Sequence, residues 1–200
     1  MLAKRMLDIV ASLLALAILA VPMSMIALAI RNESPGAAIF RQRRVGRRGK
    51  PFTMLKFRTM RADVDPYGSS PQGGQDPRLT RLGKLLRETS LDELPQLLNV
   101  LGGQMSLVGP RPLYLRQAEQ WNPQQKRRLL VRPGMTGYAQ VFGRAGLTHE
   151  EKIELDVYYV DNRSFGLDLW ILLKTAAAVI THRGAIYERR YGRDREHESD

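Results

Sequence analysis

The sequence is 200 residues long, carries a formal net charge of +11 and contains no cysteine. Disulfide bonds and thiolate chemistry are therefore excluded, and the length suits one compact domain with an additional membrane segment. The excess of Lys and Arg fits nucleic acid, an anionic membrane surface or an anionic substrate as a partner, and composition alone does not choose among these three.

The first predicted element is an apolar helix. Residues 9–30 are almost entirely apolar and include Pro22, and at ~1.5 Å per residue a helix of this length just crosses a hydrocarbon core. Basic residues flank the segment on both sides, a pattern that favours a cytoplasmic position for both ends. A kink at Pro22 allows the chain to return to the face it entered, because the Ile18 carbonyl loses its helical partner and Ser24 or a neighbouring helix can compensate.

Two other interpretations of this segment stay open at this point. A straight transmembrane anchor with its short N-terminus outside fits the heavier positive charge that follows residue 30. A cleaved signal peptide fits the Lys4-Arg5 start and the sequence Ala27-Leu28-Ala29, although the apolar region is long for a signal peptide.

A β-hairpin is predicted next. Residues 38–43 and 52–58 alternate apolar and polar side chains and are joined by a glycine-containing turn, which is typical of two short paired strands. Lys56 and Arg58 lie on the second strand, where they can face either an anionic substrate or lipid headgroups. The segment 41–50 is basic and contains no acid, so it favours contact with anionic membrane lipid or forms a solvated basic turn.

A polar loop and a short helix follow the hairpin. Residues 63–77 are rich in proline and glycine, so we predict a loop that is either a lid or an insertion without a role. The sequence Asp63-Val64-Asp65 matches the D-x-D metal site of many glycosyltransferases, but we interpret it as coincidental because it lies in this loop. Thr80 to Glu88 is predicted to be helical, with leucines on one face and Arg87 on another.

The most informative segment runs from Ser90 to Pro112, where Asp92 and Glu93 are adjacent. Ser90 and Glu93 match the S-x-x-E capping box, so Asp92 is predicted in the first turn of a helix that ends near Leu101. A helix N-terminus favours anions, and this position therefore keeps Asp92 ionised and nucleophilic while offering free N–H groups to a phosphate.

Two arginines flank these acids in the sequence. Arg87 precedes them, and Arg111 follows in a turn that two prolines make rigid. Both are predicted to bind a substrate phosphate. The plainer alternative is that Asp92 and Glu93 only cap a helix.

The second half of the chain is predicted to contain three further helices. Their start signals are Asn122 followed by Pro123, and a capping box from Thr148 to Glu151. The third helix spans residues 165–180, too short and polar to cross a bilayer, and lies in the core or at a membrane interface. Asp168 is predicted to cap it.

Other motifs in this half are weak. Residues 133–137 form either a strand entry or a tight turn that binds an anion. The tail 188–200 alternates charge and is expected to be frayed. The histidines lack metal-ligand spacing, and no Walker or dinucleotide-binding glycine motif occurs.

The blocks that carry the chemistry closely resemble the bacterial sugar transferase family, the monotopic phosphoglycosyl transferases. They occur in order along nearly the whole chain: FRQRRVG (40–46), FTMLKFRTM (52–60), DPRLTRLGKLLRETSLDELPQ with MSLVGPRP (76–112), RPGMTGYAQV (132–141) and DVYYVDNRSFGLDL (156–169).

The resemblance implies a mainly helical α+β fold. It has a re-entrant membrane helix over 1–35, bent at Pro22, a cytoplasmic catalytic domain over 36–187 with interfacial amphipathic helices, and a charged tail over 188–200. The protein would lie in the bacterial inner membrane with its catalytic domain facing the cytoplasm. Members often have serine before the bend proline and Asp at the position of Gln104, whereas this chain has Val21 and Gln104.

The resemblance also implies an activity: transfer of sugar-1-phosphate from a UDP-sugar to polyprenyl phosphate, with release of UMP. Asp92 would be the nucleophile, and Glu93 would hold Mg²⁺ together with Asp92. Asp168 matches an acidic family position near the active site. Lys56 and Arg58 would join the two flanking arginines in binding phosphate.

Expected partners are the UDP-sugar, polyprenyl phosphate and anionic membrane lipid, with no nucleic acid and with a homodimer possible. Two hypotheses of other classes remain, namely a basic nucleic-acid-binding protein and a membrane scaffold that has lost catalysis. Release of UMP in the presence of both substrates distinguishes the enzyme from either.

Overall fold

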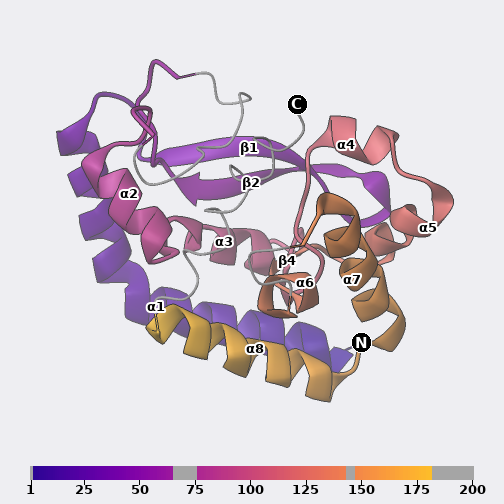
Figure 1. Cartoon of the computed structure of the whole chain (residues 1–200). Coiled ribbons are helices and arrows are strands. Elements are labelled where there is room, and N and C mark those ends of the chain that lie inside the picture. The colour runs from indigo at the N-terminus through magenta and orange to yellow at the C-terminus, as the bar shows by residue number, and fades with distance from the viewer. Residues whose placement is uncertain (1, 65–75, 143–146, 182–200) are drawn as a thin grey trace.

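The computed structural model of the protein describes residues 2–64, 76–142 and 147–181. Within these ranges the chain is mainly helical, and its strands form two separate two-stranded sheets, as the α+β prediction requires. The predicted loop at 63–77 lies mostly outside the described residues, and the tail at 188–200 lies wholly outside them. In chain order the elements in Figure 1 are α1 (Leu2–Glu33), β1 (Ile39–Val45), the 3₁₀ turn η1 (Arg47–Gly49), β2 (Pro51–Phe57), α2 (Arg81–Glu88), the 3₁₀ turn η2 (Leu91–Glu93), α3 (Gln96–Leu101), β3 (Ser106–Val108), α4 (Leu115–Glu119), α5 (Pro123–Lys126), the 3₁₀ turn η3 (Arg127–Leu130), β4 (Gly134–Thr136), α6 (Tyr138–Phe142), α7 (His149–Asn162) and α8 (Phe165–Ile180).

Helix α1 is continuous and has Pro22 inside it. Figure 1 shows it running along one edge of the molecule and then changing direction to follow a second edge. The Ser24 hydroxyl donates to the Ala20 carbonyl at 2.8 Å, because a serine in a helix reaches the carbonyl four residues before it. The expectation that Ser24 compensates the Ile18 carbonyl is therefore wrong. By length and composition α1 could cross a membrane, and its re-entry stays a prediction.

Both ends of α1 are anchored to the rest of the protein. Near its start, buried Asp8 accepts hydrogen bonds of 3.0 Å from the Ser106 hydroxyl and the Leu107 N–H. After its end, the Arg58 guanidinium donates to the carbonyls of the last turn and the residues that follow, namely Ile30, Ser34 and Pro35. A cation at a helix C-terminus satisfies carbonyls that have no helical partner. A carboxylate at the start of α1 and a guanidinium at its end thus fix this apolar helix to the rest of the domain.

The predicted β-hairpin is confirmed. Strands β1 and β2 are antiparallel, with Ile39 opposite Phe57 and Val45 opposite Pro51. Gly49 has a φ of 74° in the connection, a value that glycine adopts without strain. The hairpin packs against α3 through a buried apolar cluster, and against α1 and α2 through another. The clusters are Phe52, Met54, Val100 and Met105, and Ile30, Ala38, Phe57 and Leu86.

The expected capping box at Ser90 is wrong. Ser90 has a φ of 60° and its side chain makes no capping hydrogen bond. The chain forms the 3₁₀ turn η2, and α3 begins only after Pro95. The Glu93 carboxylate cannot bind the Ser90 N–H as a capping box requires, since it is bound instead by two cations from other elements. Asp92 therefore lies in a tight turn before the helix.

The second half packs around a small parallel sheet. Strand β3 pairs with β4, so residues 133–137 enter a strand. Asn122 and Thr148 cap α5 and α7 as predicted. Helix α8 is capped by Ser164, whose hydroxyl accepts from the Leu167 N–H at 3.1 Å. The prediction that Asp168 caps it is wrong, because Ser164 already has the extended backbone of a capping residue and Asp168 lies inside the first turn.

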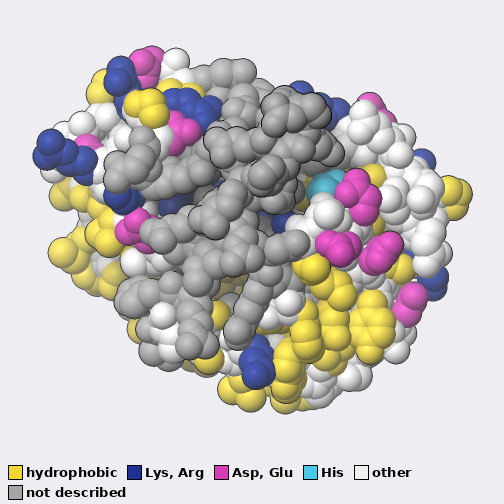
Figure 2. Space-filling model, viewed as in Figure 1, with side chains coloured by type: hydrophobic (Ala, Val, Ile, Leu, Met, Phe, Trp, Pro, Cys, Tyr) yellow, Lys and Arg dark blue, Asp and Glu magenta, His cyan; other side chains and the backbone are white. Residues whose placement is uncertain are grey.

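Helix α8 has one buried and one exposed apolar face. Ile171 is fully buried in a cluster with Val108, Tyr159 and Val160. Apolar side chains on its other side are exposed, and Figure 2 shows them gathered over α8. They include Leu169, Trp170 and Leu173. This distribution suits a helix that rests on an apolar surface, and its location at a membrane interface stays a prediction.

Candidate active site

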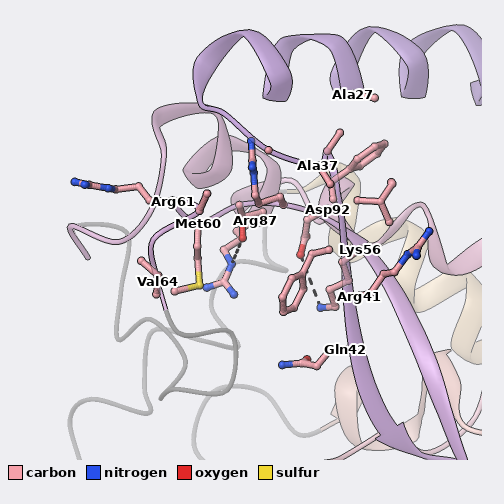
Figure 3. Close-up of a pocket in the computed structure, with 18 of the residues that line it drawn as sticks. Ala27, Ala37, Arg41, Gln42, Lys56, Met60, Arg61, Val64, Arg87 and Asp92 are labelled. Carbon is pink, nitrogen blue, oxygen red and sulfur yellow. Dashed lines mark hydrogen bonds and ion pairs between the residues drawn. The ribbon is translucent and has the colours of Figure 1, made fainter.

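A cavity of about 970 Å³ opens between α1, the hairpin and the turn that carries Asp92. Figure 3 shows Asp92 and Lys56 directed toward one another, with Arg87 beside them. Ala27 of α1 lies on the opposite side of the cavity. The cavity therefore has a polar wall from the hairpin and η2, which carries Lys56 and Asp92, and a second wall from α1, where apolar Ala27 and Leu28 lie beside Ser24 and Arg31.

Asp92 lies on the polar wall and is only 6% exposed. One cation that faces it is Lys56, whose Nζ is 3.8 Å from Oδ2. This separation exceeds the about 2.7–3.2 Å of an N–H···O hydrogen bond, so Lys56 attracts the carboxylate as a charge. A carboxylate that borders a cavity beside a cation suits attack on an anionic electrophile.

Glu93 is held between two cations. Its Oε1 lies 2.7 Å from Lys56 Nζ and 3.2 Å from an Arg111 nitrogen. Burial alone would raise the pKa of Glu93, but the charges and hydrogen bonds of Lys56 and Arg111 outweigh burial and lower this pKa to about 2. Glu93 is therefore ionised at neutral pH, and the structure brings together Lys56, Arg111 and both acids as predicted.

Arg87 and Arg58 line the same cavity but differ in their contacts. The Arg87 guanidinium donates to the Thr59 hydroxyl at 3.1 Å. Helix α2 fixes its position, because the α2 backbone at Gly83 approaches the Thr59 carbonyl too closely for any side chain. Arg58 binds the carbonyls that end α1. Its observed contacts are structural, and phosphate binding by either arginine stays a prediction.

Sequence reasoning missed a group of three residues in this cavity. Arg44 donates to Gln42 Oε1 through two nitrogens, at 3.0 and 2.5 Å, and its guanidinium lies 3.6 Å from the centre of the Tyr114 ring. Gln42 in turn donates to the Tyr114 hydroxyl at 3.2 Å. The pKa of Arg44 is lowered to about 10, mainly by burial and also by the nearby Arg111. Tyr114 and Glu93 act in the opposite direction.

A signal for this group was present in the hairpin pattern. Phe40, Gln42 and Arg44 are every second residue of β1, and Phe40 pairs with Lys56 in the neighbouring strand. Side chains two residues apart on a strand share a face. Gln42 and Arg44 therefore lie on the same face of the hairpin as Lys56, whereas Tyr114 comes from a distant segment and carries no such signal.

Arg111 is positioned by a buried ion pair behind it. Arg128 donates both to the Arg111 carbonyl at 2.7 Å and to the Asp156 carboxylate. Arg128 also lies over the Trp121 ring at 4.8 Å. Burial raises the pKa of Asp156 to about 6, although the Arg128 cation and its hydrogen bond act in the opposite direction. Helix α7 thus fixes the turn from which Arg111 reaches Glu93.

Asp168 lies elsewhere. It is buried, pairs with Lys4 at 2.7 Å and accepts from the Tyr159 hydroxyl at 2.6 Å. These residues line a second pocket beside the start of α1, which shares no residue with the cavity around Asp92. The structure therefore separates Asp168 from the other predicted site residues.

The acids of the cavity fit a metal only in part. Within residues 2–64, 76–142 and 147–181, no three His, Cys, Asp or Glu side chains form a metal-binding group. Asp92 and Glu93 supply two carboxylates, and Mg²⁺ is commonly held by one or two carboxylates together with substrate phosphates and water. The donor set therefore suits an ion that is shared with a bound diphosphate.

Comparison with known proteins identifies the family of this chain. A sequence model of the family described as bacterial sugar transferase matches residues 1–182. The chain belongs to the bacterial sugar transferase family. It is therefore a member of an enzyme family, and the matched range contains both walls of the cavity and the second pocket.

Several bacterial sugar transferases are similar to this chain. An uncharacterized sugar transferase, EpsL, of Bacillus subtilis is 45% identical over 92% of this chain and 90% of its own length. A UDP-glucose:undecaprenyl-phosphate glucose-1-phosphate transferase of Caulobacter vibrioides is 46% identical over 89% of this chain and 70% of its own length. An Aeromonas hydrophila UDP-N-acetylgalactosamine-undecaprenyl-phosphate N-acetylgalactosaminephosphotransferase is 39% identical over 91% of this chain and 44% of its own length.

Proposed function

We propose that this sugar transferase moves sugar-1-phosphate from a UDP-sugar to polyprenyl phosphate through a covalent intermediate on Asp92. The observation that carries the proposal is the position of Asp92, which is buried at a cavity with a cationic polar wall and with Ala27 and Leu28 of the long apolar helix α1 in its second wall. The names of the Caulobacter and Aeromonas relatives support the same reaction class.

In the first step, an Asp92 carboxylate oxygen attacks the β-phosphorus of the UDP-sugar. The bond from that phosphorus to the bridging oxygen breaks, and UMP leaves with this oxygen and its electron pair. Both the nucleophile and the diphosphate are anionic, so nearby positive charge is needed to lower the barrier. Lys56 and Arg44 supply that charge from the hairpin, and Arg111 supplies it from the turn after β3.

In the second step, a phosphate oxygen of polyprenyl phosphate attacks the phosphorus of the phosphosugar on Asp92. The acyl phosphate bond breaks, the Asp92 carboxylate is regenerated, and polyprenyl-diphosphate-sugar is formed. The lipid chain reaches the cavity along α1, where Ala27 and Leu28 line it, and Arg31 of the same helix is placed to attract the lipid phosphate.

Asp92, which lines this cavity, and the adjacent Glu93, which is bound to Lys56 and Arg111, are the residues that would hold Mg²⁺, with the diphosphate completing its ligands. When bound, the ion neutralises part of the diphosphate charge. Glu93 keeps its charge at neutral pH because its pKa is depressed to about 2 by Lys56 and Arg111, which outweigh the effect of burial.

We further propose that α1 enters the bacterial inner membrane from the cytoplasm and returns to it. The helix is long and apolar enough to cross a membrane, most of its apolar side chains are exposed, and it changes direction part-way along. Exposed apolar residues of α8 would rest on the same membrane surface. The catalytic cavity then faces the cytoplasm, where nucleotide sugars are made.

Replacement of Asp92 by asparagine tests the nucleophile. The amide has nearly the same shape but cannot form the acyl phosphate, so UMP release and the trapped phosphosugar-enzyme should both disappear. Asp161→Asn, which changes an exposed acid far from the cavity lining, should keep the parent rate. Purified protein in detergent, a panel of UDP-sugars and polyprenyl phosphate are needed. Turnover by Asp92→Asn near the parent rate would refute the covalent mechanism.

A further inference from the structure

The second pocket, beside the start of α1, is surrounded by positive charge. Its volume is about 210 Å³, and residues of α1, β3, η1, α7 and α8 line it together with the segment between η3 and β4. Five of the lining side chains are cationic and two are carboxylates. The cations are Lys4, Arg5, Arg47, Arg132 and Arg163, and the carboxylates are Asp8 and Asp168.

Both carboxylates of this pocket already have partners. Asp168 binds Lys4 and the Tyr159 hydroxyl. Asp8 accepts from Ser106 and from the backbone of the next residue, at 3.0 Å each. The acids therefore neutralise at most Lys4 and part of the remaining charge.

Within the described part of the chain, the side chains of the four arginines are bound by neutral groups. Each donates to backbone carbonyls: Arg5 to Val100 and Leu101, Arg132 to Gly103, Arg47 to Leu130 and Arg163 to Val160. Among the residues that the structure describes, no carboxylate forms an ion pair with any of the four. Burial lowers the pKa of Arg132, and the neighbouring Arg5 and Arg47 lower it further against the opposing effect of Asp8. Arg132, Arg5 and Arg47 thus repel one another around a pocket with room for an anion.

The rim of this pocket adjoins two exposed apolar surfaces. Ala3 of α1 and Phe165 of α8 line the pocket. Leu2 and Met6, near Ala3 on α1, are exposed, and so is Leu169, one helical turn after Phe165 on α8. A ligand with a phosphate head and an apolar tail would therefore place its head among the arginines and its tail along these helices.

We propose that this pocket binds the headgroup phosphate of an anionic phospholipid, separately from the reaction at Asp92. The guanidinium groups of Arg47 and Arg132 hydrogen bond the phosphate oxygens, as arginine commonly does. Because the pocket shares no lining residue with the catalytic cavity, a lipid seated here is not the acceptor substrate. It holds the start of α1 and the start of α8 at the same membrane depth.

Two adjacent arginines provide a matched test. Arg47 lines the pocket, whereas Arg48 is exposed and lies outside both cavities. Arg47→Gln and Arg48→Gln change the net charge equally, so a difference between them reports the pocket rather than general attraction. In non-ionic detergent, the full chain is titrated with a fluorescent short-chain phosphatidylglycerol, and binding is followed by anisotropy. Arg47→Gln should weaken binding about tenfold, and Arg48→Gln should weaken it about twofold or less.

Competitors decide which ligand the pocket takes. Unlabelled short-chain phosphatidylglycerol should displace the probe from the parent protein, while inorganic phosphate and short-chain phosphatidylcholine at equal concentration should not. Equal displacement by inorganic phosphate would show a site for free anions and would overturn the lipid assignment. Equal binding by the two variants would overturn the site itself. Should Arg47→Gln fail to fold, Arg163→Gln, whose side chain is exposed at the rim, takes its place against the same control.

Discussion

Replacing Arg128 by methionine tests the ion pair that positions Arg111. The Arg128 and Asp156 side chains are only 2% and 4% exposed, so the change leaves the Asp156 carboxylate buried without its cation. Removing one partner of a buried ion pair costs about 3–5 kcal/mol. At about 2–4 °C per kcal/mol for a chain of this size, the melting temperature should fall by roughly 6–20 °C at neutral pH.

The loss should depend on pH. Burial raises the pKa of Asp156 in the folded protein to about 6 from its usual 3.8, against the effect of Arg128. A raised folded-state pKa means that folding tightens proton binding, so the free energy of unfolding rises as pH falls through about 6. Without Arg128 this pKa rises further. In the variant, Asp156 should therefore become protonated at a higher pH. The loss in the free energy of unfolding relative to the parent should then be smaller at about pH 6 than at about pH 8.

Thermal unfolding in detergent at these two pH values measures the effect. The double variant Arg128→Met/Asp156→Leu removes both charges and should recover most of the lost stability. It still lacks the hydrogen bond from Arg128 to the Arg111 carbonyl, so its rate of UMP release should stay below that of the parent. A double variant as unstable as the single one would show that an unpaired buried charge is not the cause.

Three further predictions concern other parts of the protein. Glu93→Gln should slow UMP release. The pKa of Glu93 is depressed from 4.5 to about 2 in the folded protein, so its carboxylate contributes stability that is present above pH 4.5 and is lost as pH falls toward 2. The variant should lack this contribution, which acid unfolding measures. Arg44→Lys should weaken UDP binding about tenfold in calorimetry, since lysine cannot bind Gln42 in the same bidentate way; unchanged binding would remove Arg44 from the diphosphate site. Pro22→Leu should expose a cysteine placed at Leu2 to an impermeant thiol reagent in intact cells, while an unchanged labelling pattern would show that the proline does not set the turn.

Local signals in the sequence predicted much of this fold. The hairpin, the helix before Ser90 and the caps at Asn122 and Thr148 depend on residues close in sequence, and all are confirmed. The capping box at Ser90 failed because its glutamate is bound by cations from other elements. A local motif cannot register a competing partner that arrives through tertiary packing.

The candidate site was predictable to a similar extent. The blocks around Asp92 and Arg111 placed both acids and Arg111 in one predicted site, and the structure brings them together with Lys56, for which strand parity had left substrate and lipid headgroups as alternatives. Tyr114 stacking on Arg44 and the Lys4 contact with Asp168 join segments far apart in the chain. Periodicity carries no information about such pairs, so only the folded structure could reveal them.

The contact of Arg58 with the end of α1 couples this apolar helix to the candidate active site. Arg58 follows β2 directly, and β2 carries Lys56, whose ammonium group pairs with Glu93. A change in the tilt of α1 would therefore also move the strand that holds Lys56. Bilayers of different thickness impose different tilts on an apolar helix. In the proposed membrane setting, acyl-chain length then acts as a mechanical input to the reaction rate, even for substrates whose own solubility it leaves unchanged.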